Sequence, residues 1–520
     1  MNKNPLVLTI DVGTQSLRAS LVDKKGNIIS LIKNKYDPVY LSPENGQAEQ
    51  DADFYWNHCV SALKELAKAN PGKIENICGA TVTTFRDSAV LLDANYKPIR
   101  SVILWLDQRM AKAKERLPTL HSLAFKLVGM ENTIVLNRKR TMAHWIKENQ
   151  PDVWLKTKKY VNISTYLIYK LTGRLADSPS GLTGHYPINF KKRKWYKEGA
   201  LKGRVFGIPS RMLCELVDPC EIISTIKDEV ADETGLPRGI KVYASGSDKG
   251  CETLGLGALS KDIAAISYGT ASTVEVSNKK YHEPEPFLPA YGAVVPNWYN
   301  MEVQIYRGYW MIGWFTKEFA AKEALQAEIQ STAVEEVLNH NLASIPPGSD
   351  GLVLQPYWGP GLKRPLAKGA IVGFSDIHTR EHMYRAIIEG IAYALREGLE
   401  GIEKSQKHRV KEIRISGGGS QNDAICQITA DIFGLPVYRV QTIEATTLGA
   451  ATSVFYACGE FQSVEEGMKS MAHITDVFTP DRLANQQYQY LYKHVYLKLF
   501  PQLDSVYRNL KRYDNKFKGK

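Results

Sequence analysis

The segments "LTIDVGTQSLR" (residues 8–18) and "AAISYGTASTV" (residues 264–274) decide the fold class of this chain. When Gly13-Thr14 is aligned with Gly269-Thr270, a serine two residues later also aligns, and apolar segments flank both turns. Internal similarity usually reports a duplicated supersecondary unit. With only two copies a solenoid is excluded, so the sequence predicts a protein of two lobes.

Composition limits the classes of protein to which the chain can belong. Its 520 residues exceed what one hydrophobic core usually fills, and 44% apolar with 23% charged residues is typical of globular proteins. The formal net charge of +11 could indicate a nucleic-acid partner or an anionic ligand, but no basic stripe recurs at helical spacing. We therefore expect solvated surface charge and no nucleic-acid partner.

Cysteine usage and hydropathy predict the compartment. The seven cysteines form no CxxC motif, which argues against a disulfide framework or a zinc site and favours reduced thiols. No segment approaches the roughly 18 apolar residues of a spanning helix, and the first residues lack a secretory pattern. We expect a cytoplasmic protein with no membrane partner.

Strand-like and helix-like patterns alternate in both halves of the chain, which is typical of α/β proteins with mixed sheets. We place a domain boundary near residue 258, giving domains at 1–258 and 259–520. We expect strands at residues 6–10, 17–22, 27–33, 77–85, 88–93, 240–248, 264–276, 412–416 and 436–440, and helices at 51–70, 162–172, 249–258, 380–404, 421–433 and 445–459.

Glycine turns are candidate phosphate sites, because a tight Gly-Thr bend exposes backbone N–H groups and a hydroxyl at one point. Two matched bends in separate lobes could hold the two ends of a polyphosphate. The turn Gly417-Gly418-Gly419 is a third candidate, although close strand–helix packing is the favoured explanation for this turn taken alone. The P-loop, the strand–GxGxxG–helix motif and the protein-kinase motifs are absent from the sequence.

Two acids stand beside glycine turns, Asp11 before Gly13 and Asp248 between Gly246 and Gly250. A partly desolvated carboxylate must be hydrogen-bonded, paired or near a metal. Each acid could cap the element that follows it. Alternatively, one could position Mg²⁺ while the other accepts a proton from an attacking hydroxyl, which is most of what phosphoryl transfer requires.

The pair Arg86-Asp87 and the segment "LWLDQR", with Trp105, Asp107 and Arg109, supply charged and aromatic groups between apolar strands. An aromatic face beside acids and arginines suits substrates rich in hydroxyl groups. An internal salt bridge is the alternative explanation. The sequence leaves both readings open.

In order, the segments "IDVGTQSLRA", "GQAEQDADFYW", "WLDQR", "SYGTAS", "GGGSQND" and "EATTLGAA" resemble the FGGY carbohydrate kinases. The resemblance spans nearly the whole chain. It implies two ribonuclease-H-like lobes of the actin-like ATPase type, with ATP and Mg²⁺ in the cleft between them. It also implies a small sugar or polyol as the substrate, and a homodimer is common in the family.

The resemblance assigns roles by matching positions. It implies that Asp248 is the catalytic base and that Asp11 organises Mg²⁺, acting through water. The substrate contacts would be Arg86, Asp87, Trp105 and Asp248. The nucleotide contacts would be Gly13, Thr14, Gln15, Gly269, Thr270, Gly313, Gly418, Gly419 and Asn422.

The sequence departs from the family pattern beside the base, where Lys249 stands in place of the common glutamine. The segment "FRDS" (residues 85–88) is closer to the Arg-acid pair of glycerol and autoinducer kinases than to the xylulokinase type. We expect an ATP-dependent kinase for a small sugar, ketose or polyol. The alternatives are a catalytically degenerate regulator that binds sugar or nucleotide, and a nucleotide-driven switch that binds a protein.

Overall fold

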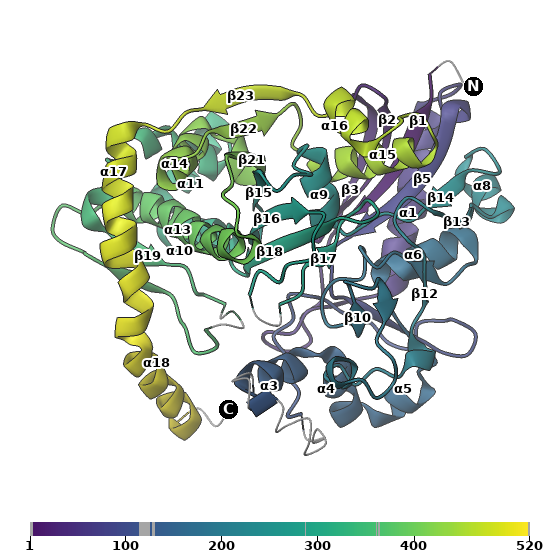
Figure 1. Ribbon diagram of the computed structural model, residues 1–520, viewed down its shortest axis with the longest axis horizontal. Helices are drawn as coiled ribbons and strands as arrows, with labels where there is room; N and C mark the ends of the chain where they lie inside the picture. The colour runs from purple at the N-terminus through teal and green to yellow at the C-terminus, as the bar shows by residue number, and fades with distance from the viewer. Residues whose placement is uncertain are drawn as a thin grey trace.

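Two mixed β-sheets organise the chain, and each contains one of the two hairpins with a Gly-Thr turn, β1–β2 or β15–β16 (Figure 1). The computed structural model describes residues 4–113, 125–126, 131–285, 288–359, 361 and 364–517. In spatial order, the first sheet consists of β13 (Ile222–Thr225), β14 (Lys241–Tyr243), β5 (Ile77–Thr84), β1 (Leu6–Val12), β2 (Ser16–Asp23) and β3 (Ile28–Lys35). The second consists of β17 (Tyr291–Gly292), β18 (Tyr299–Ile305), β16 (Ser272–Asn278), β15 (Ile263–Tyr268), β21 (Glu412–Gly417), β22 (Val437–Val440) and β23 (Ile474–Phe478).

Pairing within the two sheets repeats the same pattern. Strand β1 is antiparallel to β2 and parallel to β5, while β15 is antiparallel to β16 and parallel to β21. Asp11 lies opposite Arg18 in the first hairpin, and Ser267 lies opposite Thr273 in the second. The duplication inferred from the two Gly-Thr segments is therefore confirmed as a duplication of structure.

Smaller sheets extend each lobe. A four-stranded sheet in the first half has the order β4 (Glu49–Gln50), β7 (Val102–Ile103), β6 (Ala89–Leu92) and β8 (Lys159–Asn162). Three two-stranded pairs complete the strands of the described residues: β10 (Ile188–Asn189) with β11 (Lys194–Trp195), β12 (Glu215–Leu216) with β9 (Ala176–Asp177), and β19 (Val353–Gln355) with β20 (Ala370–Val372).

Helices cover both sheets. Those described in the first half are α1 (Ala52–Ala69), α3 (Glu131–Arg140), α4 (Met142–Asn149), α5 (Pro151–Lys156), α6 (Ile163–Thr172), α7 (Leu201–Arg204), α8 (Asp228–Thr234) and α9 (Asp248–Gly255). Those in the second half are α10 (Trp310–Phe319), α11 (Ala321–Gln330), α12 (Val334–His340), α13 (Arg380–Gln406), α14 (Asp423–Phe433), α15 (Ala445–Ala457), α16 (Val464–Met471), α17 (Arg482–Leu491) and α18 (Leu497–Phe517).

Local chemistry explains where the expected helices begin and end. The carboxylate of Asp51 accepts a hydrogen bond from the Asp53 N–H at 3.0 Å and so caps α1. Helix α6 ends at Gly173, whose φ of 78° is a left-handed conformation that favours glycine. The helices predicted at residues 51–70, 162–172 and 380–404 are confirmed as α1, α6 and α13.

The two lobes meet where α9 crosses α15, and Figure 1 shows α9 between the two sheets. A Cβ atom added at Gly255 would lie 1.9 Å from the Ala445 carbonyl oxygen, and one at Gly449 would lie 1.8 Å from that of Cys251. The two helix backbones therefore touch, and only glycine permits this approach. This contact fixes the second half of α9 against the start of α15.

Each lobe has its own hydrophobic core, one around β1, β2 and α1 and the other around β15, β16 and α13. The boundary near residue 258 falls between α9 and β15 and stays a prediction. Within the described ranges, no helix is both long enough and apolar enough to cross a membrane.

Candidate active site

A cavity of about 570 Å³ is lined by residues of both lobes. Its walls bring together seven of the predicted site residues: Thr14, Arg86, Asp87, Trp105, Asp248, Gly269 and Thr270. Residues far apart in the sequence thus meet at one place. The predicted sugar contacts, the predicted base and the turns of both hairpins share this cavity.

Asp248 is the first residue of α9, and its side chain is 28% exposed to the cavity. The expectation that it ends a strand is wrong, because β14 stops at Tyr243 and Ser247 caps the helix through the Gly250 N–H. Burial raises the pKa of the Asp248 carboxyl, while the charges of Arg86 and Lys249 oppose that rise. The carboxylate lies at a helix start with Arg86 Nε 3.8 Å away.

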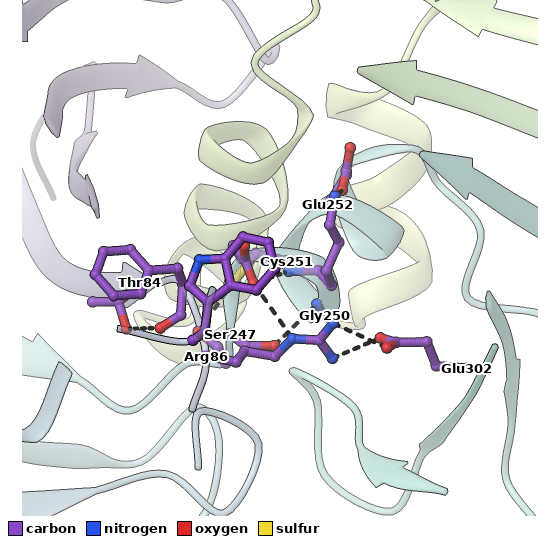
Figure 2. A network of polar contacts seen from close by, with 12 residues as sticks. Thr84, Arg86, Ser247, Gly250, Cys251, Glu252 and Glu302 are labelled. Atoms are coloured by element: carbon purple, nitrogen blue, oxygen red, sulfur yellow. Dashed lines mark hydrogen bonds and ion pairs between the residues drawn. The ribbon is translucent and has the colours of Figure 1, made fainter. Parts of the chain in front are cut away.

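Arg86 joins the two lobes. Its guanidinium donates two hydrogen bonds to the carboxylate of Glu302 on β18, at 2.6 and 2.9 Å (Figure 2). Burial opposes the charge of Arg86, but the carboxylates of Glu302 and Asp248 together raise its pKa. The internal salt bridge considered for Arg86 is therefore present, but its main partner is Glu302 rather than Asp87.

A second buried acid, Glu275, lies next to the ion pair of Arg86 with Glu302. Glu275 lies directly opposite Glu302 in the β16–β18 ladder, and its Oε2 accepts hydrogen bonds from Thr253 Oγ1 and Asn300 Nδ2. Burial and the neighbouring Glu302 raise the pKa of Glu275 well above its usual value. Burial would also raise the pKa of Glu302, but Arg86 lowers it. We infer that Glu275 is protonated and donates a hydrogen bond to the ionised Glu302.

Asp87 is held in a left-handed conformation with a φ of 57°. Its Oδ2 lies 2.6 Å from His185 Nδ1, and its Oδ1 accepts a hydrogen bond from the His185 N–H at 2.9 Å. Burial would raise the pKa of Asp87, but these contacts lower it. A Cβ at Gly184 would lie 2.6 Å from Asp87 Oδ1, so the loop opposite is shaped to admit this carboxylate.

Trp105, one of the predicted substrate contacts, is connected to the first hairpin, because its Nε1 donates a hydrogen bond to Thr14 Oγ1 at 3.0 Å. Arg109 instead pairs with Asp107 and with Glu49, each at 2.6 Å, and its side chain is 8% exposed. For Asp107 and Arg109 the internal salt bridge is the better explanation.

Asp11 is buried near the end of β1, where Arg18 Nη1 donates a hydrogen bond to its Oδ2 at 3.3 Å. Burial raises the pKa of this carboxyl to about 7, against the charge of Arg18 and with support from Asp248. Beside it, the Gly13 N–H donates to the Ser16 carbonyl, and Gln15 is exposed. No group of three or more metal-ligating side chains occurs in the described part of the chain.

The predicted adenosine contacts lie outside the cavity walls. Gly313 is exposed on α10, and Gly418 is exposed with open space around it. A Cβ at Gly419 would lie 2.5 Å from the ring of Tyr309, so this glycine is required for packing. Asn422 caps α14 by accepting a hydrogen bond from a backbone N–H at 3.1 Å. Their contacts with a nucleotide stay predictions.

Two family models cover most of the chain. The N-terminal domain of the FGGY family of carbohydrate kinases matches residues 6–255, and the C-terminal domain matches residues 264–458. The chain belongs to the FGGY family of carbohydrate kinases. This FGGY kinase is thus an ATP-dependent sugar phosphotransferase, as the sequence predicted.

Relatives of this FGGY kinase match it along nearly its whole length. A xylulose kinase of Lactococcus lactis is 29% identical over 494 residues, which are 94% of this chain and 95% of the relative. A glycerol kinase of Thermococcus gammatolerans is 28% identical over 486 residues, 91% and 93% of the two chains. A solved structure of ligand-bound xylulose kinase from Lactobacillus acidophilus has a TM-score of 0.81 at 22% identity and covers 97% of this chain and 100% of that one. This likeness shows the fold, and the predicted pair of actin-like ATPase lobes is confirmed.

Sequence reasoning missed Glu302 as a site residue. An acid inside the apolar segment "YNMEVQI" (residues 299–305) is the same signal that drew attention to Arg86, because an unpaired charge in a strand is costly. Reasoning from the sequence also considered Lys249 only as a departure from the family pattern. In this kinase, Lys249 Nζ is 2.6 Å from Glu252 Oε2 and 2.6 Å from Ser267 Oγ, inside the cavity region.

Proposed function

We propose that this kinase transfers the γ-phosphoryl group of ATP to a hydroxyl of a small sugar, ketose or polyol, with Asp248 as the general base. The observation that carries the proposal is the position of Asp248, partly exposed at the start of α9 in a cavity that also contains Arg86, Thr14 and Thr270. A carboxylate there can accept the proton of a hydroxyl while the turns of both hairpins face the same space.

The direction in which the pKa of Asp248 shifts supports its role as the general base. A general base works best when its pKa lies toward the operating pH, and burial moves the pKa of Asp248 in that direction. Arg86 and Lys249 keep it ionised by opposing the effect of burial. Lobe closure would exclude the water that competes with the substrate hydroxyl.

Mg²⁺ fits the first hairpin, since Asp11 is a buried carboxylate whose one cationic hydrogen-bond donor among the described residues is Arg18, at 3.3 Å. Water and phosphate oxygens, which Mg²⁺ commonly keeps as ligands, would supply its other contacts. When bound, the ion would neutralise charge on the phosphate groups of ATP. Asp11 would hold it through water, and Thr14 would lie beside the phosphates.

The substrate is a small hydroxyl-rich molecule, which the acids, arginines and aromatic rings on the cavity walls support. Asp87 and His185 offer a carboxylate and a ring nitrogen, and Trp105 offers a flat apolar face for C–H groups. The relatives named above act on xylulose and glycerol, so we leave the individual sugar or polyol open. The nucleotide contacts predicted at Gly418 and Asn422 belong to the same proposal.

The test is ADP release with Mg²⁺-ATP across a panel of ketoses, polyols and aldonates, with Asp248→Asn run in parallel. We expect one strong hit, and a loss in kcat of about 10³-fold or more in the variant because the base is removed. Asp232→Asn, on the exposed face of α8, is the matched control and should retain activity. Turnover in Asp248→Asn close to that of the wild type would remove Asp248 as the base. Nucleotide binding without turnover on any acceptor would favour a regulator.

A further inference from the structure

Lys249 is the second residue of α9, and its ammonium group reaches from the first lobe to the second hairpin. Its Nζ donates hydrogen bonds to Glu252 Oε2 and to Ser267 Oγ, each at 2.6 Å. Ser267 stands two residues before Gly269, and a Cβ on Gly269 would lie 3.7 Å from Lys249 Nζ. The cation therefore lies beside the second Gly-Thr turn.

The ammonium group has one hydrogen to spare. Of its three N–H donors, one goes to Glu252 and one to Ser267, and the described residues supply no third acceptor. The side chain is 17% exposed, and Lys249 lines the same cavity as Asp248 and Thr270. A ligand in the cavity can therefore take the third hydrogen bond.

Neighbouring groups fix the cation in place. Glu252, labelled on α9 in Figure 2, also accepts hydrogen bonds from Ser267 Oγ at 2.8 Å and Ser416 Oγ at 2.5 Å. Glu252 and Asp248 raise the pKa of Lys249 although burial opposes its charge, so the group stays protonated. A fixed donor costs little reorganisation when charge develops next to it.

We propose that Lys249 is a catalytic residue whose ammonium contacts the γ-phosphoryl group of ATP and stabilises it during transfer. The proposal rests on the proposed function of the site. In the step, the bond from the acceptor hydroxyl oxygen to Pγ forms as the Pγ–O bond to ADP breaks. The hydroxyl proton passes to Asp248, and Lys249 keeps its protons and offsets negative charge on the equatorial oxygens.

The test compares two nucleotides and needs no sugar. Calorimetry with Mg²⁺ measures the affinity of Lys249→Gln for AMP-PNP, which has a γ-phosphoryl group, and for ADP, which has none. Glutamine is common at this position in the family, so the variant should fold. We expect affinity for AMP-PNP to fall about 10–100-fold, the value of one charge-assisted hydrogen bond, and affinity for ADP to change less than about twofold.

Lys249→Arg keeps the charge and should retain most of the preference for AMP-PNP, while Lys261→Met on the surface is the matched control and should match the wild type. An unchanged preference in Lys249→Gln would overturn the proposal. An equal loss of affinity for AMP-PNP and ADP would also overturn it. Lys249 would then only hold the two lobes together, and its removal would affect the whole site. Asp248→Asn turnover tests the base separately, so failure of one assignment is distinguishable from failure of the other.

Discussion

The two Gly-Thr hairpins share a fold but differ in the charged groups that contact them. In the first, Asp11 lies opposite Arg18, and Arg18 also pairs with Glu444, the residue before α15 of the second lobe, at 2.9 Å. In the second, Ser267 replaces the acid and contacts Lys249 from α9 of the first lobe. Each hairpin is thus reached by the helix that crosses from the opposite lobe.

This difference separates two kinds of ligand. Burial raises the pKa of Asp11, and Arg18 opposes that rise. The nearby acids Asp248, Glu444 and Glu252 add to the rise, so further negative charge is disfavoured at this place. The second hairpin has no acid on its own strand at that position and receives an ammonium group. Under the proposals above, the first hairpin would face a metal ion and the second an anion, and groups on α15 and α9 supply charges that distinguish the two.

The largest effect should come from breaking the helix crossing on which both arrangements depend. Gly449→Val would place a Cβ 1.8 Å from the Cys251 carbonyl oxygen and force α15 away from α9. We expect a loss of more than about 4 kcal/mol in the free energy of unfolding, or no folded protein at all. Urea denaturation followed by circular dichroism measures it.

Gly401→Ala in α13 is the control for this variant. Among the described residues, its Cβ would meet one atom, the Pro284 carbonyl oxygen at 3.9 Å, and alanine favours a helix. We expect its stability to remain within about 1 kcal/mol of the wild type or to increase. Wild-type stability in Gly449→Val would contradict this prediction, because it would mean that α15 can move away from α9 without a loss in the free energy of unfolding.

The next largest effect concerns the ion pair of Arg86 with Glu302, which joins the two lobes. Arg86→Ala leaves Glu302 buried beside Glu275 without a cation, which should destabilise the protein by about 3–5 kcal/mol. The KM for the sugar should also rise, since Arg86 lines the cavity. Urea denaturation and steady-state kinetics measure the two effects.

A double-mutant cycle with Glu302→Gln sharpens this prediction. Because Arg86 donates two hydrogen bonds to Glu302, we expect the double variant to be more stable than the sum of the single losses by about 2 kcal/mol. Additive losses would mean that the pair contributes no coupling and that Arg86 acts through the substrate alone.

The sequence predicted the fold well because local signals agree with it. Asp51 and Gly173 mark the ends of their helices by capping chemistry that depends on adjacent residues only. The duplication was visible because both copies keep the same turn. Among the elements that the sequence predicted, the start of α9 shows the clearest difference, since the segment before Asp248 is apolar enough to resemble a strand, whereas Ser247 caps a helix there.

The site was less predictable because its partners are distant in the sequence. Nothing near Arg86 indicates that its acid is Glu302, and nothing near Lys249 indicates Ser267, since these contacts form only when the lobes pack together. The sequence identified charged residues that need partners. It could not say whether a ligand or the opposite lobe satisfies them.

The smallest effect that we predict tests the comparison of the two hairpins by removing the charge of Asp11 from the first one. Burial raises the pKa of Asp11 from 3.8 to about 7, so the folded protein binds this proton more tightly than the unfolded chain does. The resulting stabilisation is complete below pH 4 and is lost as the pH rises to 7. In metal-free protein, Asp11→Asn should therefore gain stability relative to the wild type across this window, by at most about 1.4 kcal/mol per pH unit.

We expect a net gain of about 2 kcal/mol at pH 8, because Arg18 loses part of its pairing when the charge is removed. Thermal unfolding in EDTA at pH 4 to 8 measures the difference between variant and wild type. Ser267→Ala in the matching position of the second hairpin should give a difference that does not vary with pH. A pH-independent difference for Asp11→Asn as well would contradict the comparison, because the two hairpins would then differ in shape rather than in charge.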